Sequence, residues 1–77
     1  MKVTIEYAGL LDIKGVASGE AVELAAGSTV RDVLGRLGVE ASHQKFITPL
    51  RNNQRAKLSD TLTDGDRLHL LLPVGGG

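Results

Sequence analysis

Residues 27–38, GSTVRDVLGRLG, are the part of this sequence that most limits how the chain can fold. Four apolar residues recur there at the spacing of one helix face: Val30, Val33, Leu34 and Leu37. Thr29 is predicted to cap the helix in a capping box with Asp32, and Gly38 to end it. One amphipathic helix needs a second layer to cover its apolar stripe, so the rest of this 77-residue chain is expected to form one sheet.

Two strands are predicted before this helix. Residues 2–7 alternate between apolar and polar side chains, which is the pattern of a half-buried strand. A second strand is predicted at residues 21–25. The segment between them, residues 10–19, contains two glycines and is predicted to be an irregular or bulged connection. The two strands together are expected to form a hairpin with a long loop.

Further strands are predicted after the helix, beyond a polar loop at residues 39–45. Residues 46–50 are expected to form an edge strand, an interrupted strand or something irregular, because Pro49 cannot donate a backbone hydrogen bond. The last strand is predicted at residues 67–72. The interval between them is predicted to hold a turn at Asn52-Asn53, a short strand at 54–57, a helical turn at 58–62 and a turn at Asp64-Gly65.

This order of elements predicts an α+β fold of the β-grasp, or ubiquitin-like, type. The first and last strands are the most apolar, so they are expected to lie side by side and parallel at the centre of the sheet. The sheet is expected to be mixed, with four or five strands, and to pack on the one main helix. Residues 1–72 are predicted to form the domain and residues 73–77 a flexible glycine tail.

The composition argues against several classes of function. There are no cysteines, which excludes disulfides, thiolate nucleophiles and thiolate metal sites. Nine Lys and Arg balance nine Asp and Glu, and the charges are spread along the chain. Binding to nucleic acid or to a membrane surface is therefore not expected, because either would need a clustered basic face. No apolar run approaches a membrane span, and the cytoplasm is the expected location.

The residues that could carry chemistry do not form a known catalytic or metal-binding pattern. His43 and His69 are far apart in the sequence and have no cysteine or paired carboxylate at ligand spacing. The acidic group Asp60, Asp64 and Asp66 flanks a turn and lacks the spacing of a calcium loop. There is also no catalytic serine triad order and no phosphate-binding glycine loop. We therefore expect no metal site, no bound cofactor and no catalysis by this chain alone.

The C-terminal stretch LLLPVGGG is the remaining candidate for a functional segment. Pro73 cannot continue a strand through its own nitrogen, so it marks where the sheet is expected to end. The five residues from Pro73 onward span about 16–18 Å when extended. Three residues without a Cβ make a thread narrow enough for another protein's cleft. The composition alone leaves this reading open beside that of a loose chain terminus.

The segments TDGDRLHLLLPVGGG, GSTVRDVLGRLG and VTIEYAGLLD give the chain a specific resemblance. The first resembles the C-terminal end of the ubiquitin-like sulfur carriers of the ThiS/MoaD family, whose members end in a Gly-Gly pair. The second resembles the helix of that family. The third resembles the first strand and following segment of its molybdopterin-synthase branch, the small subunit, which is slightly preferred over the thiazole branch.

This resemblance implies that Gly77 is the reacting residue and that Gly75 and Gly76 thread a partner's active site. An E1-like enzyme would use ATP and Mg to adenylate the Gly77 carboxylate. A sulfur donor, such as a cysteine desulfurase or a rhodanese, would then lead to a thiocarboxylate. A sulfur-accepting synthase subunit would receive the sulfur for molybdopterin, for the thiazole of thiamine or for another sulfur-containing metabolite.

The surface that docks on these partners is expected beside the tail. The candidates are Tyr7, His69, Leu71 and Leu72, with Leu10 or Leu11. For Tyr7 and Leu72 the alternative is an ordinary place in the core. Two other functions stay open at this point. One is a protein modifier that is joined to lysines through its C-terminal glycine, and the other is a plain interaction module with inert glycines.

Overall fold

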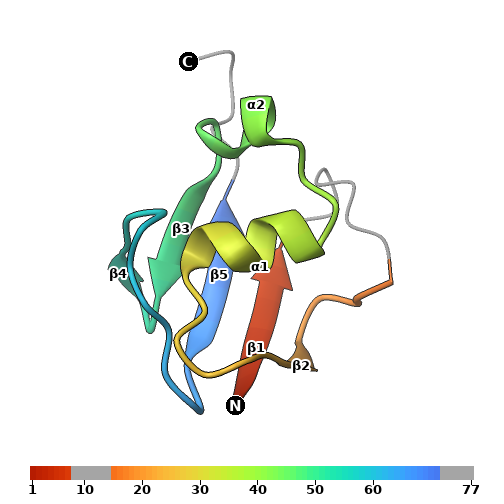
Figure 1. Ribbon diagram of the computed structural model, residues 1–77, viewed down its shortest axis with the longest axis vertical. Helices are drawn as coiled ribbons and strands as arrows, with labels where there is room; N and C mark the ends of the chain where they lie inside the picture. The colour runs from red at the N-terminus through yellow and green to blue at the C-terminus, as the bar shows by residue number, and fades with distance from the viewer. Residues whose placement is uncertain (8–14, 72–77) are drawn as a thin grey trace.

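The computed structural model describes residues 1–7 and 15–71, and Figure 1 shows their arrangement. A five-stranded sheet in the order β2-β1-β5-β3-β4 lies behind the main helix. The strands are β1 (Lys2–Tyr7), β2 (Glu20–Glu23), β3 (Thr48–Arg51), β4 (Gln54–Arg55) and β5 (Arg67–Leu71). The helices are α1 (Val30–Arg36) and α2 (Ala41–Gln44). None of the helices in these residues is long and apolar enough to cross a membrane.

The first and last strands lie side by side at the centre of the sheet, as predicted. β1 pairs with β5 in parallel, with Ile5 beside Leu68 and Tyr7 beside Leu70. β2 adds to the other side of β1 antiparallel, and β3 adds antiparallel to β5. The topology confirms the predicted β-grasp fold, a mixed sheet covered by one main helix.

Helix α1 begins and ends where the sequence predicts. Thr29 and Asp32 form the capping box, each side chain accepting a hydrogen bond from the other's backbone N–H. Gly38 has φ +83 and follows the C-cap, and the N–H groups of Gly38 and Val39 donate back to Gly35 and Leu34. The apolar stripe of the helix faces the inner side of the sheet, where Ile5, Leu68 and Leu70 are fully buried.

Two local predictions were wrong. Residues 39–45 were expected to be a loop, yet 41–44 form the short helix α2, which the side-chain amide of Gln44 supports by donating to the Val39 carbonyl. Residues 58–62 were expected to contain a helical turn, but the described segment has only a turn there. The carbonyls of Leu58 and Asp60 accept from the first N–H groups of α1, so they are not available for a helix of their own.

Pro49 does not place β3 at an edge of the sheet, because β3 lies between β5 and β4. The Pro49 carbonyl accepts from the Ala56 N–H at 2.9 Å, which puts the carbonyl on the β4 side of the strand. The nitrogen of an extended residue points to the same side as its carbonyl. The missing donor of Pro49 therefore faces away from β5, and since β4 is only two residues long, no ladder bond between β3 and β5 is lost.

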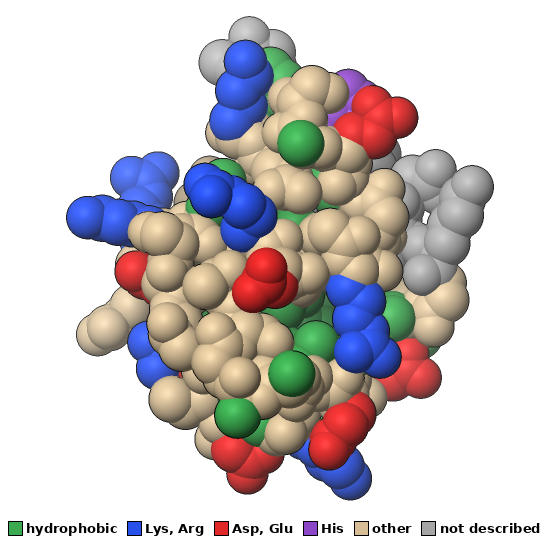
Figure 2. All heavy atoms as spheres, in the orientation of Figure 1, with side chains coloured by type: hydrophobic (Ala, Val, Ile, Leu, Met, Phe, Trp, Pro, Cys, Tyr) green, Lys and Arg blue, Asp and Glu red, His purple; other side chains and the backbone are tan. Residues whose placement is uncertain are grey.

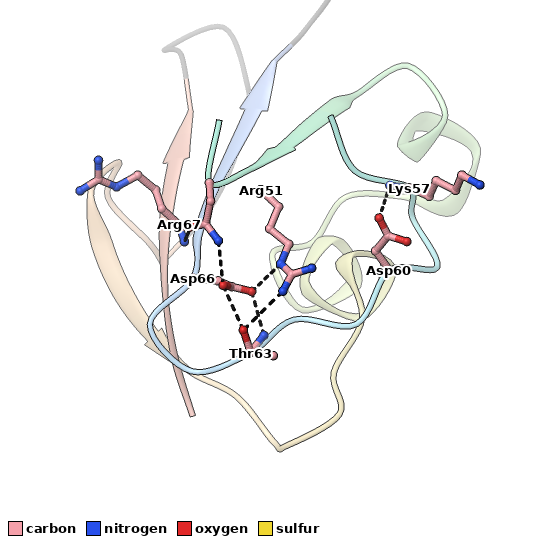
Figure 3. A network of polar contacts seen from close by, with 7 residues as sticks. Arg51, Lys57, Asp60, Thr63, Asp66 and Arg67 are labelled. Atoms are coloured by element: carbon pink, nitrogen blue, oxygen red, sulfur yellow. Dashed lines mark hydrogen bonds and ion pairs between the residues drawn. The ribbon is translucent and has the colours of Figure 1, made fainter. Parts of the chain in front are cut away.

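A buried carboxylate, Asp66, ties the start of β5 to the turn between β3 and β4 (Figure 3). Its oxygens accept from the Arg51 guanidinium at 2.7 Å and from the Asn52 amide at 2.9 Å. They also accept from the backbone and hydroxyl of Thr63. Asn52 and Asn53 both have positive φ, as expected of a two-residue hairpin turn, so this network holds the hairpin against the central strand.

The ionised form of Asp66 is the one that this network stabilises. Burial alone would raise the pKa of the carboxyl, but the hydrogen bonds from Thr63, Asn52 and Arg51 outweigh it and lower the pKa from 3.8 to about 2. A group whose pKa is lower in the folded state stabilises the fold above its unfolded pKa. That stabilisation is lost as the pH falls from 3.8 toward 2.

Asp66→Asn is expected to lower the free energy of unfolding at neutral pH by about 2 kcal/mol, because it removes the charge that the network is built around. Urea unfolding at a series of pH values measures this. The wild-type chain should lose a similar amount of stability on acidification below pH 3.8, and the variant should lose much less.

The matched control is Glu40→Gln, since Glu40 is exposed and its side chain makes no cap hydrogen bond. This variant should keep both the stability and the acid sensitivity of the wild type. If Asp66→Asn unfolds with the wild-type pH profile, the network does not have the role described here.

Candidate functional site

The glycines of the predicted tail, Gly75, Gly76 and Gly77, lie outside the described residues, as does Leu72. The structure does describe the strand that leads toward them, β5, up to Leu71. Leu71 pairs with Thr48, the first residue of β3. The beginning of β3 and the end of β5 therefore lie at the same end of the sheet, and a partner that binds the tail would meet this end first.

We call the side of the sheet that faces away from α1 the outer face. Strand register places on it side chains from the three middle strands β1, β5 and β3: Thr4, Glu6, Arg67, His69, Leu71, Thr48 and Leu50. Their neighbours along each strand, such as Leu68 and Leu70, are buried on the inner side. Because side chains alternate across a strand, the two sets are separated completely.

His69 and Leu71 lie on the outer face and are half-buried, so the structure brings these two predicted docking residues together. Leu50 lies directly across from His69 on β3 and is half-buried as well. Leu50 was not among the docking residues predicted from the sequence. Its position follows once β3 is known to pair with β5, because Pro49 points inward and its neighbour must then point outward.

The charges on the outer face lie on the β1 side of this apolar strip. Glu6 and Arg67 form an ion pair at 3.3 Å between neighbouring strands, with side chains 35% and 63% exposed. An exposed pair of this kind contributes little to stability. Register places Glu6 beside His69 and Arg67 beside Thr4, so this charged pair borders the half-buried strip at His69.

Tyr7 is not brought together with His69 and Leu71. It pairs with Leu70 on the inner face and packs against the core. Its hydroxyl donates to the Val16 carbonyl, and its backbone N–H donates to the Ser18 hydroxyl at 2.9 Å. The alternation of β1 explains this position, since Tyr7 follows Val3 and Ile5 at a spacing of two. The other candidates, Leu10 and Leu11, lie outside the described residues.

The acidic residues and histidines noted in the sequence do not gather into a site. Asp60 accepts a hydrogen bond from the Lys57 N–H and stabilises the turn between them. Asp64 accepts from the Lys2 N–H and so joins its turn to the start of β1. Asp66 is the centre of the network described above. His43 is on α2, whereas His69 is on the outer face. Within residues 1–7 and 15–71, no group of three metal-ligating side chains could hold an ion.

Comparison with known proteins gives a matching family and several solved structures of the same fold. The family model described as the ThiS family matches residues 7–77. No curated protein matches the chain. Among solved structures, SAMP1 from Haloferax volcanii is 26% identical with a TM-score of 0.72, and the match covers 100% of both chains.

Two further solved structures share the fold. One is a putative molybdopterin converting factor subunit 1 from Pyrococcus furiosus, 23% identical, with a TM-score of 0.71 over 95% of this chain and 98% of that one. The other is a complex of subunits 1 and 2 of the molybdopterin-converting factor from Helicobacter pylori. The matched chain there is 22% identical, with a TM-score of 0.63 and full coverage of both chains.

The different positions of Tyr7 and His69 give a testable contrast. Tyr7→Phe is expected to lower the free energy of unfolding by about 1 kcal/mol, because it removes the hydrogen bond to Val16. His69→Ala is expected to change it by no more than about 0.5 kcal/mol, because His69 lies on a solvated face. Chemical denaturation of both variants measures the difference, and a larger loss for His69→Ala would contradict this assignment of faces.

Proposed function

Because this chain belongs to the ThiS family, we propose that it is a sulfur carrier whose C-terminal carboxylate becomes a thiocarboxylate. The observation that carries the proposal is the family match, which runs through Gly77 on a β-grasp domain. In that domain, β5 is a middle strand of the sheet and leads directly toward the glycines. The domain is then the part of the chain that partners bind while the terminus reacts.

The reaction proposed for Gly77 follows from the weakness of a carboxylate as an acyl electrophile. An E1-like enzyme would join the carboxylate to the α-phosphate of ATP and release pyrophosphate. The persulfide of the sulfur donor then attacks the carbonyl carbon, the C–S bond forms, and the bond to AMP breaks. A thiol then reduces the S–S bond of the resulting acyl disulfide, which leaves the thiocarboxylate on Gly77 and a disulfide between the thiol and the donor cysteine. Gly75 and Gly76 suit the approach to such a site, because no Cβ keeps the backbone away from the nucleotide.

The catalytic groups in this proposal belong to the partners. The activating enzyme binds ATP and Mg, a cysteine desulfurase or rhodanese supplies the sulfur, and a synthase subunit accepts it. The part of this chain that they would contact is the outer face near the end of β5, where Leu50, His69 and Leu71 lie. We therefore propose that the chain is a carrier and not itself an enzyme.

For the destination of the sulfur we propose molybdopterin. The support is the likeness of the first segment, VTIEYAGLLD, to the molybdopterin-synthase branch, together with a long connection between β1 and β2. The thiazole of thiamine is the competing destination. Presenting the thiocarboxylate form separately to a molybdopterin precursor and to a thiazole synthase distinguishes the two, since sulfur transfer is expected only with the first.

The test of the carrier function is intact-mass spectrometry after incubation with an activating enzyme, ATP and a sulfur source. One oxygen of the chain is expected to be replaced by sulfur. Deletion of both Gly76 and Gly77, which leaves no Gly-Gly end, or Gly76→Ala, should abolish the change while the fold remains. The matched control is Gly35→Ala, because Gly35 lies on the exposed side of α1 and an added Cβ there meets no atom within 4 Å.

The control variant should be activated as well as the wild type and be about 1 kcal/mol more stable, since alanine favours a helix over glycine. An unchanged mass for the wild-type chain with an activating enzyme of this family would contradict the carrier function. A Gly76→Ala variant that still gains sulfur at the wild-type rate would contradict the role proposed for Gly76 in reaching the activating site.

A second function, protein modification, is favoured by one observation. The chain is 26% identical over its full length to SAMP1, and a second structure of that protein is described as small archaeal modifier protein 1. In this alternative, the activated Gly77 is captured by a lysine of another protein. Cells with a tagged copy would then show conjugates that resist denaturant and disappear when Gly76 and Gly77 are both deleted.

A further inference from the structure

A hollow of about 240 Å³ lies between the α2–β3 connection and β4, away from the middle of the outer face. Its apolar lining consists of Ile47, Pro49, Ala56 and Leu58. Two cations, Lys45 and Arg55, also line it. An apolar floor with cations beside it suits a ligand that is itself apolar with acidic groups, because each part of such a ligand meets a complementary surface.

A second hollow of about 300 Å³ continues from the first, since both are lined by Arg55 and Ala56. Its other lining residues are polar and include Arg51, Asn52, Gln54 and Asp60. We call the two hollows together the β4 groove. Two adjoining hollows that share Arg55 and Ala56 suit a segment of polypeptide better than a compact small molecule.

Two cations of the β4 groove, Lys45 and Arg55, have no ion-pair partner among the residues that the structure describes, whereas the third, Arg51, pairs with Asp66. The ion pairs within the described residues use Arg51, Arg67 and the N-terminal amine as cations. Neither Lys45 nor Arg55 takes part in one. Both side chains are exposed. Figure 2 shows basic side chains gathered on the side of the molecule that holds α2 and β4. The neutral net charge of the chain therefore hides a locally basic edge.

An exposed aromatic residue adjoins the same place. Phe46 is 55% exposed and is the one large hydrophobic residue exposed to this degree within residues 1–7 and 15–71. The Lys45 ammonium lies 5.3 Å from the centre of its ring. An aromatic side chain that stays in solvent next to an apolar hollow is characteristic of a protein interface, where it becomes buried on binding.

We propose that the β4 groove docks an extended segment of a partner protein in which acidic residues flank apolar ones. The carboxylates of the segment pair with Arg55 and Lys45, and its apolar side chains cover Leu58, Ile47 and Phe46. This inference goes beyond the proposed function. It concerns a surface other than the middle of the outer face and holds whether or not Gly77 is activated.

The occupant is a partner and not a second copy of the chain or a nucleic acid. The opposite edge strand, β2, carries Glu20 and Glu23, but Glu23 already pairs with the N-terminal amine and Glu20 accepts from the Ala17 N–H. A nucleic acid would need a broad basic face, and Asp60 lines the groove beside Arg55. A short acidic and apolar segment satisfies both the two cations and the apolar floor.

The experiment is an NMR titration of the isotope-labelled chain with a short synthetic peptide in which glutamates flank leucines. Amide shifts are expected in residues 44–48 and 54–58. Arg55→Glu and Lys45→Glu should each weaken binding about tenfold, since each turns an attraction into a repulsion. Phe46→Ser should weaken it as well, and a peptide with lysines in place of the glutamates should not bind.

The matched control is Arg36→Glu, which makes the same charge change at an exposed position at the end of α1, on the β2 side of the sheet. It should bind the peptide as the wild type does, and so should the chain without Gly77, which separates this proposal from the carrier function. The proposal is overturned if the peptide fails to bind at millimolar concentration, or if the shifts fall on other strands. It is equally overturned if Arg36→Glu weakens binding as much as Arg55→Glu, or if the groove mediates self-association instead.

Discussion

The parallel pairing of β1 with β5 is the contact on which the rest of this structure depends. It joins residues at the two ends of the described chain, Lys2–Tyr7 and Arg67–Leu71, so everything between them must form one crossover. A parallel pair needs such a crossover, and α1 supplies the layer that covers it. The backbone of Thr4 donates to the Asp66 carbonyl at 2.9 Å, so the buried Asp66 network also sets where β5 begins beside β1.

This pairing also separates the two faces of the sheet by function. The inner side chains of β1 and β5 are part of the core, whereas their neighbours along each strand lie on the outer face, where we propose that partners dock. A carrier needs this separation, because its partners have to hold the domain without disturbing its core. The β4 groove lies at the edge of the same sheet, so one small domain offers two surfaces of different chemistry.

Much of the fold was predictable because its signals are local. The stripe of Val30, Val33 and Leu34 with its capping box fixes α1, and the alternation of residues 2–7 fixes β1. What the sequence did not reveal depends on contacts between distant residues. Leu50 joins the outer face only through its pairing with His69, and Tyr7 turns inward to pack with the core and to bind Val16.

The same reason explains the remaining differences. Leu58 and Asp60 do not form a helix of their own, because their carbonyls accept hydrogen bonds from the first N–H groups of α1. Asp66 looked like one member of a loose acidic group, but Arg51 and Asn52 make it a structural carboxylate. The reactive terminus was suggested by the resemblance of its residues to a family and not by any pattern that composition or periodicity supplies.

The central position of β5 has a mechanical consequence. Hydrogen-bonded neighbours flank this strand on both sides, β1 on one and β3 on the other. A force applied to the chain beyond Leu71 acts along the strand axis, so the bonds of both ladders are strained together in shear and do not open one after another. In the carrier function proposed above, an enzyme that drew the end of the chain along this axis would therefore not peel β5 from the sheet.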